Sequence, residues 1–309
     1  MTTGGRVDRA ALADEPHSPS ARSGSSEDAI ASVVIPARNE EAVIGRCLHA
    51  LLDDAGPGEL EVVVVCNDCL DRTSAVARSI DPTVKVVELP VPSKASALNA
   101  GDAVARAFPR FYVDADVELT PESLRAVAQA LTSGNVACAA PSPHFALADR
   151  SWFIRQFYDI WQRLPYLNSN VIGSGVYALS AEGRTRFDRF PALTADDQFV
   201  MQLFPSEQRR SFGQYRFTVH PPTTLTGLLH MRTRAYRGNI ELAASGLAAN
   251  APPSGAGRAL LTLARQPRLL PGMATYVGVN VLARVHASWA WKVRRSSWER
   301  DESARAVAR

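Results

Sequence analysis

The sequence predicts an α/β protein built on a doubly wound sheet, in which parallel strands alternate with helices through right-handed crossovers. Short β-branched runs and helix-like segments alternate four times between residues 31 and 116. The run at 61–65 is almost wholly apolar, which is typical of a parallel strand buried on both faces. Polar clusters at 38–39, 67–68 and 114–116 follow strands, at the edge of the sheet where such proteins bind ligands.

The first half of the chain contains the regular alternation. Ordered structure is expected from Ala31, with a first strand that Pro36 ends and a first helix that Asn39 caps. Asp71 is expected to cap the second helix. The predicted strands are 32–36, 61–65, 84–89 and 111–113, and the predicted helices are 40–52, 71–80 and 94–107.

The second half is less regular. Pro121 opens a helix, since proline suits the first helical turn. The predicted helices are 121–131, 152–164 and 223–248, and the predicted strands are 136–140 and 176–179. Proline and glycine mark a linker at 250–257. We therefore divide the chain into a disordered tail at 1–29, one domain at 30–249, and a linker with a C-terminal helical extension at 250–309.

Composition limits the class of protein. The 309 residues carry a formal net charge of +3, too small by itself to indicate nucleic-acid binding. Residues 1–29 lack the apolar core of a signal peptide. The best candidate for a membrane span, 269–291, is interrupted by Pro271, Asn280 and Arg284. We expect a cytoplasmic protein, and peripheral contact of its basic, aromatic C-terminal segment with the inner face of the cell membrane stays open.

Asp114-Ala115-Asp116 is the most informative chemical feature. Carboxylates at i and i+2 after a buried strand point to the same side of the chain. Mg²⁺ is commonly held by one or two carboxylates together with substrate phosphates, and such a metal can neutralise a departing diphosphate. The plain alternative is a solvated acidic loop, and spacing alone does not decide between the two.

Each of the other charged candidate residues has a functional and a structural interpretation. Asp196 and Asp197 precede an apolar run and can supply a general base, or they can be first-turn residues stabilised by the helix dipole. Lys94 lies where a helix starts after a strand and can reach a phosphate. Arg234 and Arg237 suit phosphate oxygens. For the three cations, a solvated surface position is the alternative.

The segment 66–69 contains Cys66 and Cys69, which have the spacing of a thioredoxin-type redox site. A zinc site lacks a second pair, since Cys47 and Cys138 are isolated. We interpret the two residues as reduced cysteines beside a polar loop, because the surrounding chain fits another family better.

In order and spacing, these segments resemble the family-two glycosyltransferases with the GT-A fold, over about residues 31–245. The matching motifs lie at 34–41, 64–73, 94–101, 114–116, 173–175 and 196–197. The resemblance implies a mixed sheet with a Rossmann-like nucleotide-binding half, an acceptor half and C-terminal helices. It also implies Mg²⁺ or Mn²⁺ as the cofactor, held by Asp116 with help from Asp114.

The resemblance assigns roles to further residues. Asp197 becomes the preferred catalytic base, with Asp196 next. The donor-binding residues become Pro36, Arg38, Glu40, Asn67, Lys94, Asp114, Asp116, Arg234 and Arg237. The acceptor side is expected at Gly173, Ser174 and Gly175, and aromatic faces at Trp152 and Trp161 suit sugars or lipids, although core packing explains these two aromatics better.

The implied activity is hexosyl transfer from a nucleotide-diphosphate sugar to an acceptor hydroxyl, by metal-assisted single displacement with inversion, in polysaccharide or glycoconjugate biosynthesis. Asn67 replaces an aspartate common in the family, and because an amide both donates and accepts hydrogen bonds, UDP- and GDP-linked donors stay open. The acceptor is a sugar, a lipid-linked molecule or another small molecule. The alternatives are a non-catalytic protein of the same fold, a nucleotidyltransferase, and a redox protein built on Cys66 and Cys69.

Overall fold

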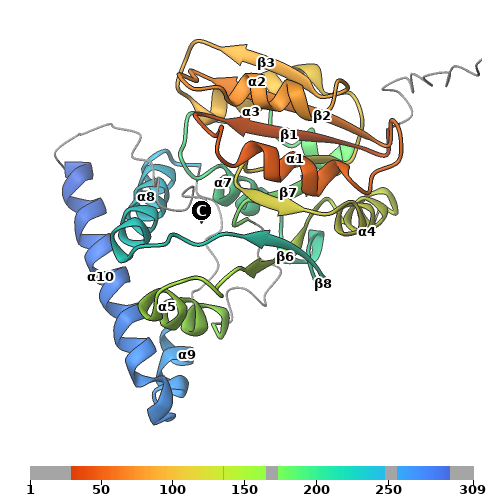
Figure 1. Ribbon diagram of the computed structural model, residues 1–309. Coiled ribbons are helices and arrows are strands. Elements are labelled where there is room, and N and C mark those ends of the chain that lie inside the picture. The colour runs from red at the N-terminus through yellow and green to blue at the C-terminus, as the bar shows by residue number, and fades with distance from the viewer. Residues whose placement is uncertain (1–28, 135, 165–172, 248–255, 293–309) are drawn as a thin grey trace, which may run out of the picture.

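The computed structural model describes residues 29–134, 136–164, 173–247 and 256–292. Its centre is an eight-stranded mixed sheet in the order β3-β2-β1-β4-β7-β6-β8-β5, which confirms the predicted α/β class (Figure 1). The predicted tail lies outside the described residues up to position 28, as do residues 248–255, which include most of the linker predicted at 250–257, and residues 293–309.

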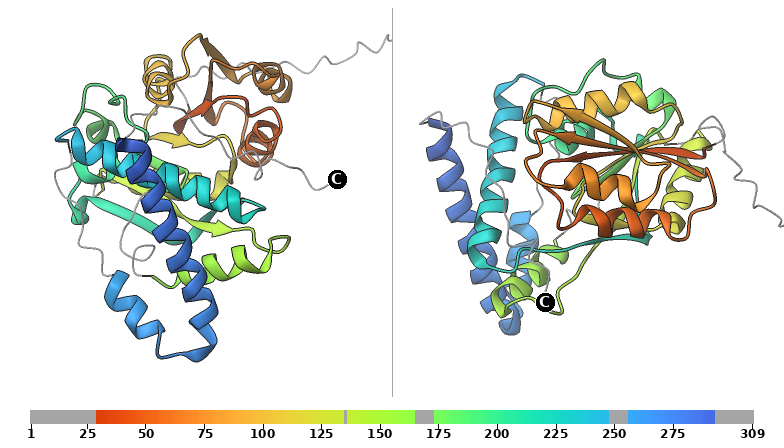
Figure 2. Two further views of the ribbon diagram at one scale, coloured as in Figure 1. Left: turned by 90° about the vertical axis from the view of Figure 1, so that its left-hand side faces the viewer. Right: turned by 45° about the horizontal axis from the view of Figure 1, so that its top comes forward.

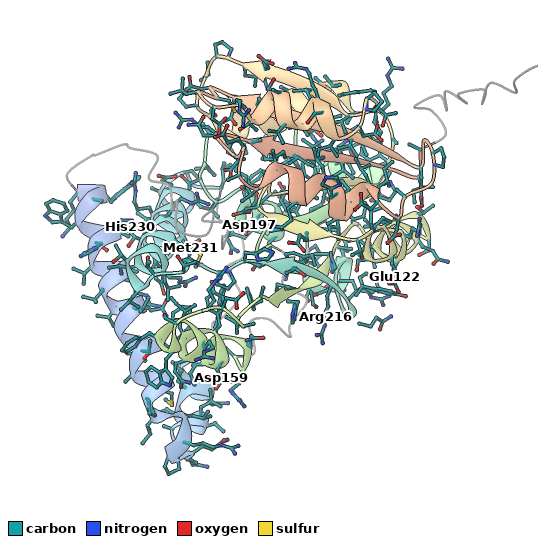
Figure 3. All side chains as sticks on the ribbon, viewed as in Figure 1. Glu122, Asp159, Asp197, Arg216, His230 and Met231 are labelled. Atoms are coloured by element: carbon teal, nitrogen blue, oxygen red, sulfur yellow. The ribbon has the colours of Figure 1, made fainter. Side chains whose placement is uncertain are left out.

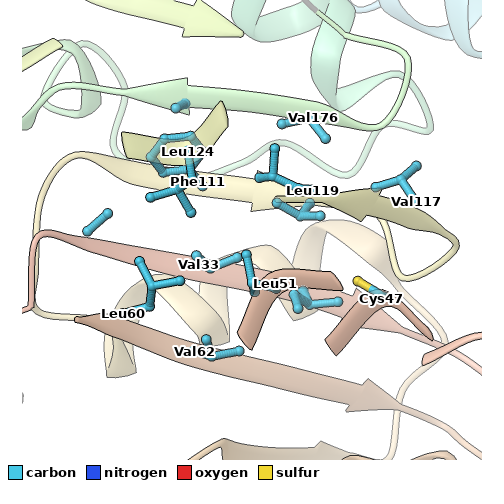
Figure 4. Packing of buried hydrophobic residues seen from close by; sticks show 14 of the residues in the cluster. Val33, Cys47, Leu51, Leu60, Val62, Phe111, Val117, Leu119, Leu124 and Val176 are labelled. Atoms are coloured by element: carbon cyan, nitrogen blue, oxygen red, sulfur yellow. The ribbon is translucent and has the colours of Figure 1, made fainter. Parts of the chain in front are cut away.

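The first half of the sheet is parallel, as the apolar strands predict. Its strands are β1 (Ala31–Ala37), β2 (Leu60–Asn67), β3 (Lys85–Leu89) and β4 (Arg110–Val113), and its helices are α1 (Ile44–Leu52), α2 (Thr73–Ile80) and α3 (Lys94–Val104). Val33 and Val62 pack in a cluster with α1, whereas Val34 and Val63 pack in another cluster with α3. Helices therefore cover both faces of the sheet (Figure 2), and Figure 4 shows the cluster that contains Val33 and Val62.

Strand β1 continues through Pro36, where the sequence had predicted its end. Pro36 pairs with Val65 of β2, but the pairing of β1 with β4 stops at Val34. Proline cannot donate to a ladder, and here one side of the strand has no partner to receive a bond. The strand can therefore accommodate proline without losing a hydrogen bond.

The second half of the sheet is mostly antiparallel. Its elements are β5 (Val117–Leu119), α4 (Pro121–Thr132), β6 (Cys138–Phe145), α5 (Trp152–Gln162), β7 (Val176–Leu179), α6 (Ala181–Arg184), α7 (Asp196–Leu203), a 3₁₀ turn (Ser206–Gln208) and β8 (Arg209–Val219). Strand β7 joins the halves by pairing antiparallel with β4 and β6. The sequence did not predict β5 or β8, because β5 has three residues and β8 is largely polar with a single buried residue.

Three helices complete the chain: α8 (Leu225–Ala244), α9 (Ala256–Leu263) and α10 (Leu270–Lys292), with a 3₁₀ turn (Pro267–Leu269) between the last two. Helix α10 lies along α8 and α5 at one side of the molecule (Figure 1). Leu228 of α8 and Val279 of α10 share a cluster with Ile154 and Phe157 of α5. Among the helices described, none is both long and apolar enough to cross a membrane.

The expected cap of the first helix is wrong. Helix α1 begins at Ile44, and Asn39 lies before it with a φ of 50°. The Asn39 side chain instead accepts a 2.7 Å hydrogen bond from the backbone N–H of Leu70. The expected cap of the second helix is also displaced: Arg72 is the N-cap of α2, while Asp71 precedes it and its Oδ1 accepts the N–H of Thr73 at 3.0 Å. These side chains fix the loops that follow β1 and β2.

Candidate active site

Lys94 lies at the centre of the site. Its Nζ is 2.8 Å from Asp114 Oδ1 and 2.8 Å from Asp196 Oδ1. Lys94 is the first residue of α3, Asp114 follows β4, and Asp196 begins α7, so three elements distant in sequence meet here. Burial alone would lower the pKa of the Lys94 ammonium, but the two carboxylates outweigh it and raise that pKa.

Asp196 is buried and fully engaged by the protein. Its Oδ1 accepts Lys94, and its Oδ2 accepts a 2.9 Å hydrogen bond from the hydroxyl of Tyr177 on β7. Only 5% of its side chain is exposed. Both of its oxygens thus have partners that hold the carboxylate in place.

Asp197 differs from its neighbour in its surroundings. It is half-buried, its Oδ1 accepts the N–H of Gln198 at 2.7 Å, and its Oδ2 accepts the N–H of Ser174 at 3.4 Å. Burial, with a further contribution from the charge of Asp196, raises the pKa of Asp197 to about 6. Figure 3 labels this residue, on the side of the sheet that helix α8 approaches. Because its pKa is raised to about 6, the carboxylate of Asp197 can bind a proton near neutral pH.

The glycine segment at 173–175 joins the two acidic positions. Its three residues have positive φ values of 132°, 66° and 112°, which the two glycines tolerate readily and which are uncommon for a residue such as Ser174. A Cβ on Gly173 would lie 2.5 Å from Asp197 Oδ2. The carbonyl of Gly175 accepts a 2.8 Å hydrogen bond from the N–H of Asp114. The predicted acceptor-side glycines thus support both Asp114 and Asp197.

The ends of β1 and β2 form the neighbouring part of the same sheet edge. Arg38 pairs with Asp68 at 2.8 Å, and the N–H of Glu40 donates to Thr73 Oγ1 at 2.7 Å. Asn67 is buried, and with its amide oriented to satisfy its neighbours it donates to the carbonyl of Ala37 and accepts from the N–H of Ser93. An aspartate could not donate to that carbonyl, which gives asparagine a structural reason to occupy this position.

The carboxylates present fit a divalent metal that shares its coordination with a diphosphate. Asp114 and Asp116 are half-buried, and Asp114 Oδ1 faces one ammonium group. No group of three or more histidine, cysteine, aspartate and glutamate side chains that could hold a metal exists in the described part of the chain. Mg²⁺ commonly takes one or two carboxylates and completes its shell with phosphate and water oxygens, which this pair allows.

The remaining predicted residues lie on helices α8 and α5. Arg234 is exposed and Arg237 is half-buried on α8, and the adjacent Gly238 packs against Ala195 at the start of α7. Trp152 is 47% exposed. Trp161 packs among aromatic rings and under a guanidinium, with Phe145, Phe157, Tyr158 and Arg232 as its neighbours.

The sequence reasoning did not identify two residues near the site. Tyr177 supports Asp196, and His220 lies 2.6 Å from Glu118, two positions after Asp116. Pairing of β5 with β8 places His220 there, through a contact between residues 102 positions apart. No short motif signals such a contact, so only the topology reveals it.

The cysteine pair lies at the end of β2. All four cysteines are free, Cys66 is buried and Cys69 is half-buried. A hydrogen bond from Cys66 lowers the pKa of the Cys69 thiol to about 6, and the N–H of Asn39 adds to this effect at 3.4 Å. The two cysteines therefore lie beside the loops that contain Arg38 and Asp68.

Comparisons with known proteins agree with this arrangement. Residues 32–179 match the model of Glycosyl transferase family 2. A 4,4'-diaponeurosporenoate glycosyltransferase from Staphylococcus aureus is 28% identical over 169 residues, which are 53% of this chain and 42% of that protein. The match therefore spans less than half the length of this relative.

Among solved structures, a mannosyltransferase from Pyrobaculum calidifontis in complex with GDP-Man and Mn²⁺ has a TM-score of 0.60 at 20% identity. The similarity covers 84% of this chain and 87% of that one, so the likeness of fold extends well beyond the segment matched by the family. With its mixed sheet, its acidic motifs in order and this match, the chain has the GT-A fold, and its segment 32–179 belongs to glycosyl transferase family 2.

Proposed function

We propose that this protein transfers a sugar from a nucleotide-diphosphate sugar to an acceptor hydroxyl, by single displacement with inversion. The observation that carries the proposal is the meeting of Asp114, Lys94 and the Asp196-Asp197 pair at the carboxyl ends of the strands. The family and the acidic residues support it together. The sugar is expected to be a hexose, and UDP- and GDP-linked donors are both compatible with Asn67.

Asp197 is the group we assign as the base. It is half-buried and its pKa is raised to about 6, so at neutral pH it is ionised yet able to accept a proton from an acceptor hydroxyl. Asp196, whose oxygens are both engaged, positions Lys94. The N–H of Ser174 orients the Asp197 carboxylate toward the glycine segment.

Donor binding is assigned to the edge formed by β1, β2 and β4. Arg38, held by Asp68, faces the nucleotide in this proposal, and Lys94 lies close enough to Asp114 to contact a diphosphate. A Mg²⁺ or Mn²⁺ ion held by Asp114 and Asp116 supplies neutralisation of the diphosphate leaving group when it is bound. Arg234 and Arg237 of α8 are assigned to the diphosphate as well, because α8 packs against the start of α7.

The first experiment measures donor binding and turnover separately. Melting temperatures of the wild type, Asp116→Asn and Asp197→Asn are recorded with GDP-Man or UDP-Glc, with and without Mn²⁺. A ligand that binds only the folded state raises the melting temperature. One donor should do so in the presence of metal, and Asp116→Asn should abolish that rise.

Turnover is followed as nucleoside diphosphate release with a panel of sugar, glycolipid and small-molecule acceptors. Asp197→Asn should keep the donor-induced shift and lose turnover at least a hundredfold, the range typical of general-base catalysis. The absence of any metal-dependent shift, or full turnover by Asp197→Asn, would contradict the proposal.

A further inference from the structure

Helix α10 has two faces of opposite character. Val279, Asn280 and Ala283 are buried toward α8 and α5, and Asn280 Oδ1 accepts hydrogen bonds from Arg232 and Tyr236 of α8. The other face carries apolar side chains that are 43–59% exposed. We call it the α10 stripe, and it consists of Leu270, Val277, Val281, Leu282, Val285 and Trp289.

The side chains of the α10 stripe stay exposed among the described elements. In the left view of Figure 2, α10 lies in front of the molecule, and its outer side faces the viewer. Val277, Val281 and Val285 follow one another at intervals of four residues, so they form a continuous row along the helix. A contiguous apolar row of this kind on a surface indicates a binding partner.

The charge around the stripe indicates what kind of partner it binds. The chain has no aspartate or glutamate between Glu241 and Glu299. In the same interval it has exposed cations on α9, on α10 and at the corner between them, at Arg258, Arg265, Arg268, Arg284 and Lys292. None of these cations forms an ion pair with another described residue.

We propose that the α10 stripe docks the protein on an anionic lipid bilayer, with α10 lying in the plane of the interface. The apolar row would enter the boundary of the acyl chains, while the surrounding cations face anionic headgroups. The tryptophan at the end of α10 suits this depth, since indole rings favour the interface. This inference rests on the surface of the helix and does not depend on the transferase activity.

A second copy of the chain is the main alternative occupant, and the charge argues against it. A two-fold dimer uses the same patch on both subunits, so two cationic surfaces without carboxylates would face each other. Like charges across an interface oppose association. An anionic bilayer satisfies both the apolar row and the cations.

The test is co-sedimentation of the full chain with vesicles of phosphatidylcholine alone or with 30% phosphatidylglycerol, at low and high salt. The wild type should bind only the anionic vesicles, and more weakly at high salt. Val281→Glu/Val285→Glu should reduce binding at least tenfold. Arg258→Gln/Arg265→Gln/Arg268→Gln should also reduce it at least tenfold, since each cation near an anionic surface contributes about fivefold.

The matched control is Leu70→Glu/Val91→Glu, which adds the same charge at exposed apolar positions far from α10 and should bind like the wild type. Circular dichroism confirms that each variant is folded. Three results would each overturn the proposal: no binding of the wild type to anionic vesicles, equal binding by the α10 variant and its control, or a wild-type dimer that the α10 variant dissociates without any vesicle binding.

Discussion

Two adjacent aspartates in the first turn of α7 have different hydrogen-bond partners, and we assign them different roles. Asp196 and Asp197 begin the same helix, yet the first is held by Lys94 and Tyr177, while the second receives only backbone N–H groups. A carboxylate whose oxygens are both occupied is poorly placed to take a proton. Residue spacing could name the pair and only the family resemblance ordered its members, because their partners come from α3, β7 and the glycine segment.

The raised pKa of Asp197 predicts the pH dependence of the reaction. Since the base must be ionised, kcat/KM should fall about tenfold per pH unit below about 6 and should be level above it. Steady-state nucleotide release between pH 4.5 and 8 measures the profile. A flat profile across pH 6 would show that another group takes the proton.

The raised pKa of Asp197 also lowers the stability of the folded protein as pH rises, whereas the predicted activity rises over the same range. The pKa of Asp197 is higher in the folded state than its ordinary value of 3.8, so the folded protein holds this proton more tightly. This group therefore contributes less stability as pH rises from about 4 through about 6. Asp197→Asn should consequently melt higher than the wild type at pH 7.5 in a thermal denaturation experiment, by about 2–4 °C for each kcal/mol of stability gained.

The partners of Lys94 could not be predicted from a sequence motif. The sequence placed it near phosphates, but its two partners lie 20 and 102 positions away in the chain, and no spacing rule links them. The polar clusters at Arg38, Asn67 and Asp114 lie at one edge of the sheet, because β1, β2 and β4 are parallel and their carboxyl ends lie together. Their chemical roles stay predictions.

At the scale of elements, the glycine segment is the part most sensitive to a single methyl group. Gly173→Ala would place a Cβ 2.5 Å from Asp197 Oδ2 at a φ of 132°, so the loop or the carboxylate must move. We expect kcat to fall at least tenfold while the donor-induced rise in melting temperature persists. Nucleotide release and thermal shift on the same preparations measure both effects.

Gly213→Ala on β8 is the matched control, because its Cβ would meet no atom within 4 Å and its φ is not positive. Its activity should stay within twofold of the wild type. If the two variants were equally active, the close approach of Gly173 to Asp197 would have no part in catalysis.

The elements themselves were predicted unevenly, for physical reasons. The buried parallel strands are apolar on both faces, so composition identifies them. Strand β8 contains Arg209, Arg210, Gln214 and Arg216 and carries few buried side chains, so its pattern is weak. It forms because β6 and β5 supply partners on both sides, which is a tertiary effect that local sequence does not encode.

At the scale of the whole molecule, Asp102 of α3 joins the two halves of the sheet. Its Oδ1 accepts from Arg110 and Tyr112 of β4, and its Oδ2 accepts from Arg184 of α6, each at 2.7 Å. The side chains of Asp102 and both arginines are at most 14% exposed. Removal of one partner from a buried ion pair leaves the others uncompensated, which costs about 3–5 kcal/mol.

Asp102→Ala should therefore lower the free energy of unfolding by about 3–5 kcal/mol, as measured by urea denaturation. The control is Asp159→Ala, whose ion pair with Arg163 is 40–44% exposed and should contribute less than about 1 kcal/mol. Similar losses in both variants would show that the Asp102 network does not hold the halves together.

The glycine segment also has a thermodynamic consequence for the two substrates. Its Gly175 carbonyl holds the backbone of Asp114, on the side assigned to the donor, and its Ser174 N–H holds Asp197, on the side assigned to the acceptor. A displacement of this loop by either substrate acts on the residue that serves the other. Coupling of this kind is reciprocal. If donor binding changes the affinity for the acceptor by some factor, acceptor binding changes the affinity for the donor by the same factor.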